Sequence, residues 1–270
     1  MRIRIRHHMS YIWRTPAKSI IQIMRLTPRN HEGQRVGSWY TDINVDHALR
    51  VSEDAYGNHV HTISIDGPLS KLNVTVEGDV ETFDTAGVLR DAIERFPTIF
   101  YLRSTPDTET SGALRDFASE ATATATDALG RMHALMGAIS DRIECTKGAP
   151  SAAATAFEKQ SGTGADLAQI FIAGARHIGV PARFVSGYYF NPEAGVHADA
   201  HGWAEAFIEG LGWVGFDPAN CICPTESHVS VARALDYIGA APVRASRSGG
   251  EGEDMTSQVR VSQQQDQRQS

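Results

Sequence analysis

Hydrophobic and polar residues alternate along the first third of the chain, as they do in strands with one buried face. Turn-forming residues interrupt the alternation near Gly33, Gly57 and Gly67. Short strands separated in this way are typical of an antiparallel sheet or a small sandwich. The segments expected to form strands are residues 2–6, 20–26, 60–65 and 72–80.

Apolar residues take on a helical spacing from Ser111 onward. Leu114, Phe117 and Ala118 lie at i, i+3 and i+4, which is the spacing of one buried helix face. Similar stripes predict helices over residues 129–139 and 166–177, the second of which ends before Gly179 and Pro181. Strand-like segments follow at residues 183–190, 201–208 and 213–216. Helices followed by an antiparallel meander predict an α+β domain.

These patterns divide the chain into three parts. Its 270 residues are 41% hydrophobic, which is enough for one large domain or two smaller ones. We expect an N-terminal β domain over residues 1–83 and an α+β core over residues 84–245. Residues 246–270 contain few apolar side chains, so we expect a flexible tail there.

The net charge and the lack of long apolar segments limit the kinds of partner that we expect. A net charge of −7 argues against nucleic-acid binding, which needs a basic surface. Residues 1–10 lack the apolar run of a signal peptide, and no stretch reaches the roughly 18 apolar residues of a membrane helix. A cytoplasmic protein without membrane contact is expected. The chain also lacks a phosphate loop, a dinucleotide fingerprint and a calcium loop, so no cofactor is expected.

The cysteines do not form a disulfide framework. There are three, Cys145, Cys221 and Cys223, and the last two are too close for an ordinary disulfide or a zinc knuckle. Three reduced thiols are the simplest interpretation.

The strongest chemical signal is a histidine and an aspartate on neighbouring strands. His201 begins one expected strand and Asp217 ends its hairpin partner, so the imidazole and the carboxylate can meet. A carboxylate that holds a histidine fixes its tautomer, which is the orienting half of a nucleophile–base–acid triad. Spacing alone favours equally a structural His–Asp hydrogen bond.

The residues around this pair resemble those of a known family. The segments HGWAEAF (201–207) and LGWVGFDPAN (211–220) are similar to the His and Asp motifs of bacterial transglutaminase-like proteins, which have a papain-like core. The resemblance spans nearly the whole chain. Its other segments are residues 26–29, 33–34, 54–58, 179–188, 223–225, 228, 236–237 and 241–244.

The resemblance implies a thiol acyl-transfer frame without its thiol. In the family the nucleophilic cysteine begins a helix, and the matching segment here is GTGADLAQ (162–169), with Gly164 at the cysteine position. His201 would be the base and Asp217 its orienting acid. Other positions that would line the cleft are Thr163, Ala165, Asp166, Trp203 and Trp213. The two tryptophans are equally explained as core residues.

Other residues of the chain could supply a nucleophile or bind a metal ion. Ser161 and Thr163 are adjacent hydroxyls, but helix capping explains them better. The set His197, Asp199 and His201 has a spacing of two, so all three could share one face of a strand and bind a metal ion. The alternative is a loop around His197, with only His201 pointing inward.

Three functions therefore remain open. The first is a pseudoenzyme that binds a peptide or amide ligand, or pairs with an active paralogue. The second is a hydrolase that uses a relocated nucleophile or a metal. The third is a structural scaffold with a vestigial cleft.

Overall fold

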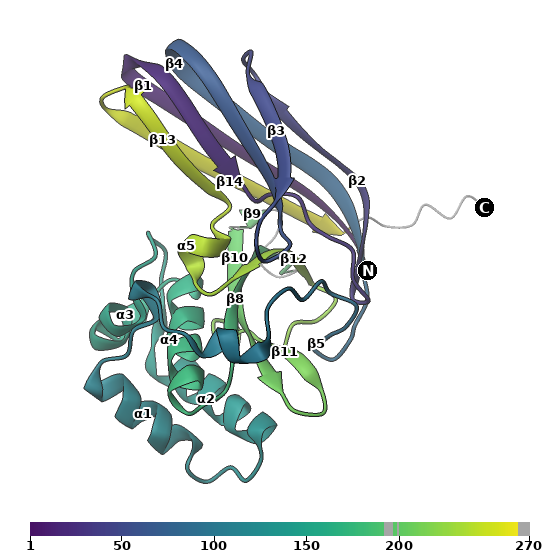
Figure 1. The fold of residues 1–270 in the computed structure, drawn as a ribbon, viewed down its shortest axis with the longest axis vertical. Coiled ribbons are helices and arrows are strands. Elements are labelled where there is room, and N and C mark those ends of the chain that lie inside the picture. Colours follow the sequence, from purple (N-terminus) through teal and green to yellow (C-terminus); the bar gives the residue numbers. More distant parts are fainter. Residues whose placement is uncertain (192–196, 199, 264–270) are drawn as a thin grey trace, which may run out of the picture.

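The computed structural model describes residues 1–191, 197–198 and 200–263. The chain forms a long, curved antiparallel sheet that stands on an α+β core (Figure 1). The α+β class expected from the sequence is confirmed. No helix among the described residues has the length and apolar character that crossing a membrane requires.

Two very long strands form the centre of the first sheet. β1 (Arg2–Met24) and β4 (His59–Thr82) pair antiparallel, with a register irregularity between Ile12 and Ala17. Side chains along β1 alternate between buried and exposed, because successive residues of a strand face opposite sides. The sequence predicted this periodicity, but it divided each strand into two shorter ones. The neighbours are β2 (Gln34–Ile43) and β3 (Ala48–Glu53), which both pair with β4.

The segment expected to be a flexible tail is part of this sheet. β13 (Val243–Gly249) and β14 (Glu253–Gln263) both pair with β1, and β14 also pairs with β9 (His197–Ala198). β14 has few apolar residues, but Val259 and Val261 are buried in a cluster with Ile3 and Ile5. The prediction was wrong for residues 246–263, because pairing with a distant strand supplies the hydrogen bonds that local composition cannot reveal.

The core has one sheet with helices packed against it. The sheet order is β12-β8-β10-β11-β5; α1 to α4 gather beside this sheet, whereas α5 lies next to the base of the first sheet (Figure 1). The helices are α1 (Gly112–Thr122), α2 (Ala128–Arg142), α3 (Ala153–Lys159), α4 (Gly164–His177) and α5 (Tyr237–Ala240). The strands are β5 (Val88–Leu89), β8 (Ala182–Tyr189), β10 (Ala200–Ile208), β11 (Gly212–Phe216) and β12 (His228–Ala234).

Short elements complete the core. The 3-10 helices η1 (Thr98–Leu102) and η2 (Pro106–Thr108) lie in the segment between β5 and α1. β6 (Glu144–Cys145) pairs parallel with β7 (Ser161–Gly162), which places Cys145 opposite Gly162. This pairing holds the loop after α2 against the residues that precede α4.

Helix α4 is the central element of the core. Its N-cap is Thr163, whose side chain accepts a hydrogen bond from the Asp166 backbone, and Asp166 bonds back to Thr163 in a capping box. Nearly every residue from Asp166 to Arg176 is buried, because neighbouring helices and the sheet surround the helix. The helix ends before Gly179, whose positive φ of 82° suits glycine.

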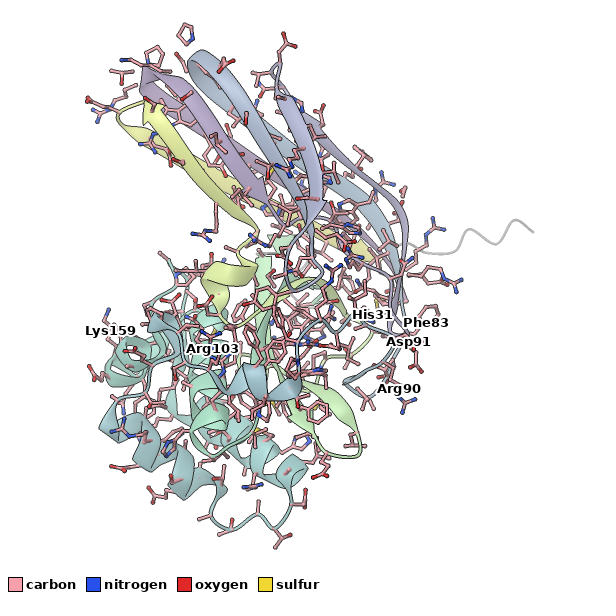
Figure 2. The ribbon with its side chains drawn as sticks, in the orientation of Figure 1. His31, Phe83, Arg90, Asp91, Arg103 and Lys159 are labelled. Atoms are coloured by element: carbon pink, nitrogen blue, oxygen red, sulfur yellow. The ribbon has the colours of Figure 1, made fainter. Side chains whose placement is uncertain are left out.

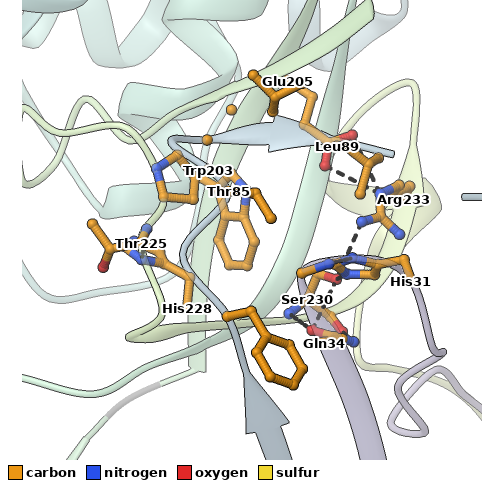
Figure 3. A pocket seen from close by; sticks show the side chains of 16 residues that line it. His31, Gln34, Thr85, Leu89, Trp203, Glu205, Thr225, His228, Ser230 and Arg233 are labelled. Atoms are coloured by element: carbon orange, nitrogen blue, oxygen red, sulfur yellow. Dashed lines mark hydrogen bonds and ion pairs between the residues drawn. The ribbon is translucent and has the colours of Figure 1, made fainter. Parts of the chain in front are cut away.

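Polar contacts join the first sheet to the core. The Gln34 side chain donates to the Ser230 carbonyl at 2.8 Å and accepts from the Ser230 amide at 2.9 Å, as a neighbouring strand would. His31 and Arg233 lie beside this pair around a small cavity of about 50 Å³ (Figure 3). In the wider view, His31 and Phe83 lie where the first sheet meets the core (Figure 2). The Ser230 contacts therefore fix one part of the chain against the other.

Candidate active site

The two residues singled out on the hairpin meet in the structure. The Nε2 atom of His201 on β10 lies 2.7 Å from Oδ2 of Asp217, which directly follows β11. Ala204 pairs with Phe216 across the two strands, so the ends of the strands carry both side chains to the same place. The histidine side chain is 15% exposed, whereas the aspartate is fully buried.

Asp217 is held by several donors. Besides His201, its carboxylate accepts hydrogen bonds from the Asn220 side chain at 2.7 Å and from the Ala219 backbone at 3.1 Å. Burial alone would raise its pKa, but His201 and the hydrogen bonds of His228 and Asn220 outweigh burial and hold the pKa far below the usual range. The carboxylate is therefore ionised at neutral pH.

A second histidine approaches the same carboxylate oxygen. Nε2 of His228 on β12 lies 3.2 Å from Oδ2 of Asp217, and the His228 side chain is 2% exposed. The Thr225 amide donates to Nδ1 of His228 at 3.1 Å. Nδ1 must accept that bond, so the proton of the neutral ring is on Nε2 and points at Asp217.

Gly164 lies beside His201 at the start of α4. A Cβ atom at Gly164 would lie 3.5 Å from Cε1 and 3.6 Å from Nδ1 of His201, and 3.5 Å from the Ala219 Cβ. These are ordinary contacts, so a side chain would fit there and would face Nδ1. A side chain at residue 164 would therefore lie at the start of a helix, next to a histidine whose other ring nitrogen contacts a carboxylate.

A cleft of about 850 Å³ opens over this position. Gly164, His201 and Asn220 line it together with Thr163 and Ala165. Its other wall comes from the first sheet, through Met255, Ser257 and Val261 of β14. The C-terminal hairpin thus completes the cleft that the core begins.

Three residues expected to line the cleft lie elsewhere. Asp166 is buried beneath the cleft, where it accepts from the backbone amides of Thr163 and Ser151 at 2.6 Å each. Trp213 packs under the Arg183 guanidinium, 3.9 Å from its ring centroid. Trp203 is buried against His228, with ring centroids 5.4 Å apart. Both tryptophans are buried, as the core alternative expected, but their strand positions lie on the face of the sheet opposite the helices.

One cluster has the composition of a metal site. His201, Asp217 and His228 offer atoms within 4.8 Å of one another. Both Nε2 atoms, however, carry the protons that Asp217 accepts, and the Thr225 amide occupies Nδ1 of His228. These donors do not fit a metal ion. Of the set His197, Asp199 and His201 predicted from spacing, Asp199 and the side chain of His197 lie outside the described residues.

Only one cysteine lines the cleft. Cys145 contributes to the lining, and burial, with the nearby Asp217 and Asp166 charges, raises the pKa of its thiol. Cys221 is exposed in the turn after Asn220, and burial raises the pKa of Cys223. All three are free thiols.

Sequence reasoning missed two residues of the site. His228 entered the sequence analysis only as part of a resemblance, because β8 and β10 lie between its strand and β11, and spacing could not place it. Asn220 follows the Asp-Pro turn, and its amide side chain three residues after a buried aspartate is the signal that could have identified it.

Both parts of the chain match known families. Residues 3–81 match the bacterial transglutaminase-like N-terminal region, and residues 115–218 match the transglutaminase-like superfamily. An uncharacterized protein of Mycobacterium leprae is 27% identical over 267 residues, which cover 92% of this chain and 94% of that protein.

A solved structure shares the fold over nearly the whole chain. A candidate cysteine protease from Cytophaga hutchinsonii superimposes with a TM-score of 0.79 and 18% identity, over 97% of this chain and 90% of that one. The periplasmic domain of TgpA from Pseudomonas aeruginosa is 20% identical and aligns with a TM-score of 0.39, over 78% of this chain and 73% of that one.

Proposed function

We propose that this chain, which belongs to the transglutaminase-like superfamily, no longer carries out thiol acyl transfer and instead binds a peptide or amide ligand in its cleft. A protein ligand, including an active paralogue, would present such a segment. The observation that carries the proposal is the place of Gly164. A side chain there would face Nδ1 of His201 at 3.6 Å, and glycine supplies none.

Neighbouring hydroxyls do not replace the thiol. The Thr163 hydroxyl donates to Asp166 at 2.9 Å and accepts from the Asp166 amide at 3.3 Å. A hydroxyl engaged in this way caps the helix, and its hydrogen is directed to Asp166 and not to His201. Thr163 therefore supports the loss of nucleophilic chemistry.

A binding role is favoured by what the cleft retains. Asp217, its donors and His201 are in place, and the cleft of about 850 Å³ has the size of ligand pockets in other proteins. Apolar and polar groups face each other across it, with Tyr189 on the core side and Met255 on β14.

One observation favours a second function, hydrolysis with a relocated nucleophile. Cys145 lines the same cleft as His201. Its raised pKa opposes the thiolate form that such chemistry needs. Hydrolysis is therefore the weaker candidate.

The test uses the whole chain and its His201→Ala variant. Heptapeptides selected on the chain from a random library are measured for affinity, and casein is the probe for amide hydrolysis and peptide cleavage. We expect no turnover of casein and at least a tenfold loss of peptide affinity in His201→Ala. Turnover that His201→Ala abolishes would establish an enzyme instead. Peptides that bind equally to both proteins would indicate a vestigial cleft.

A further inference from the structure

Asp217 sets the protons of two histidines. An ionised carboxylate can only accept hydrogen bonds, so the Nε2 atoms of His201 and His228, at 2.7 and 3.2 Å, both donate to it. The Asp217 carboxylate therefore determines that both histidines carry a proton on Nε2.

His228 acts as a neutral donor. Its Nδ1 accepts from the Thr225 amide at 3.1 Å, and a proton on Nδ1 would set two N–H groups against each other. Tyr189 and Trp203 enclose its ring, with centroids 4.6 and 5.4 Å away. His228 thus holds Asp217 without adding charge.

His201 is left with one free atom. Because Nε2 donates to Asp217, Nδ1 of the neutral ring carries a lone pair, and it faces the place where a side chain of residue 164 would lie. Among the residues that the structure describes, Nδ1 has no hydrogen-bond partner. Because His201 lines the open cleft, a donor on a bound ligand can reach this nitrogen.

The size of the space beside Gly164 and the charges around it restrict the kind of donor group that can bind there. The space beside Gly164 is bounded by Ala219 and His201 at 3.5 Å from an added Cβ, so it admits a small group. A carboxylate would meet the negative field of Asp217 and Asp166, which also raises the pKa of the Cys145 thiol. An ammonium group needs about three acceptors when it leaves water, and this space offers one.

We infer that the space beside Gly164 is a subsite for a hydroxyl or thiol of the bound ligand, which donates its hydrogen to Nδ1 of His201. Since the proposed function is ligand binding in this cleft, the inference rests on it and narrows the ligand to peptides with serine, threonine or cysteine at one position. His228 is the positioning residue, since it fixes the carboxylate that keeps His201 in the accepting form.

The first experiment follows the ring nitrogens of His201 by NMR in protein with 15N-labelled histidine, at a pH where the ring is neutral. Ethanol and ethanethiol are the probes, and they separate a hydroxyl from a thiol preference. We expect a saturable shift of the Nδ1 signal toward that of a hydrogen-bonded nitrogen. Acetate and ethylammonium should give no such shift.

The matched control is Gly164→Ala, which fills the space with a methyl group at ordinary contact distances. It should abolish the response to both probes. An equal response in this variant, a stronger response to acetate or ethylammonium, or no response in the wild type would overturn the subsite.

A second experiment places the hydroxyl in the chain itself. Gly164→Ser should fold with an equilibrium constant about fivefold larger than that of Gly164→Ala, the value of one modest hydrogen bond. The difference should vanish when His201→Ala is added to both variants. A difference that persists without His201 would mean that the serine acts elsewhere.

The role of His228 is tested by two substitutions with opposite expectations. His228→Gln keeps a donor toward Asp217, whereas His228→Phe keeps the packing and loses the donor. We expect a single His201 tautomer in the wild type and in His228→Gln, and a mixture in His228→Phe. A mixture of tautomers in His228→Gln and a single tautomer in His228→Phe would mean that His228 acts only by packing.

These results are separable from the proposed function. If selected peptides bind, and lose affinity in His201→Ala but not in Gly164→Ala, the cleft binds ligands and the subsite is wrong. If neither variant changes peptide affinity but ethanol or ethanethiol still shifts Nδ1, the subsite stands and the peptide ligand is wrong.

Discussion

His201 and Asp217 are joined by a 2.7 Å contact between Nε2 and Oδ2 across the end of a β hairpin. The same histidine turns its other ring nitrogen toward Gly164, 3.6 Å from where a Cβ atom would lie. A histidine held by a carboxylate thus faces a position that has no side chain.

Gly164→Cys should create an activated thiol. The added side chain has room, and His201 together with the start of α4 would stabilise its thiolate. An ordinary thiol is only about 0.3% ionised at pH 6. Iodoacetamide labelling at residue 164, followed by peptide mass spectrometry, should be at least tenfold faster than labelling of glutathione at that pH. Adding His201→Ala should reduce the labelling rate to that of glutathione. An equally fast rate without His201 would show that His201 does not activate a thiol at residue 164.

Cys145 should react slowly in the wild-type protein. Burial and the charges of Asp217 and Asp166 raise the pKa of its thiol, so the thiolate is scarce at neutral pH. Labelling of Cys145 between pH 6 and 8 should be slower than that of free cysteine, and Cys145→Ser should leave ligand binding unchanged. Rapid labelling near pH 6 that His201→Ala slows would identify Cys145 as a relocated nucleophile.

The contact between the first sheet and the core should be sensitive to acid. His7 on β1 is 3% exposed and contacts the Tyr188 hydroxyl at 3.1 Å and the Ser257 hydroxyl at 2.9 Å. Burial, with a smaller contribution from His8, lowers the pKa of His7 from 6.5 to about 4.

Between these values the unfolded chain binds a proton at His7 that the folded chain does not. Stability should therefore fall as the pH drops from 6.5 to 4, by on the order of 3 kcal/mol from this residue. Urea unfolding of the wild type and of His7→Gln at pH 7 and pH 4.5 measures the effect. We expect a smaller pH dependence in His7→Gln; equal slopes would show that His7 does not titrate in this window.

Replacing Arg183 should lower the free energy of unfolding far more than replacing a surface arginine. It is 2% exposed and contacts Glu205 at 2.6 Å and Glu94 at 2.8 Å. Arg183→Met leaves Glu205 buried with fewer partners, which typically costs about 3–5 kcal/mol.

Arg4 supplies the matched control. It pairs with Glu77 at 2.6 Å but is 48% exposed. Arg4→Met should cost no more than about 1 kcal/mol, because water screens the pair. Urea unfolding of the two variants compares them directly, and equal losses would mean that the Arg183 network adds nothing through its burial.

The sequence predicted those features that depend on local spacing. The helical stripe of α4, the strand alternation and the meeting of His201 with Asp217 across a short hairpin all follow from residues close in the chain. Position 164 was identified by its motif, and the structure places it at the start of α4 beside His201.

What the sequence did not reveal depends on distant contacts. Residues 253–263 are largely polar, and only their pairing with β1 makes them a strand. His228 reaches Asp217 because β12 lies beside β8, which in turn lies beside β10. Neither pairing leaves a periodic signal, because the partners are remote in sequence.

The first sheet combines strands from the beginning and the end of the described chain, and this affects how it folds during synthesis. β1 and β4 come first, the whole core follows, and β13 and β14 then pair with β1. During synthesis one edge of β1 stays open until residues 243–263 have left the ribosome, although the core between them can already be folded. An open edge invites pairing with other chains. The slowest and most error-prone step of biogenesis should therefore be the late docking of this hairpin, which also builds the second wall of the cleft.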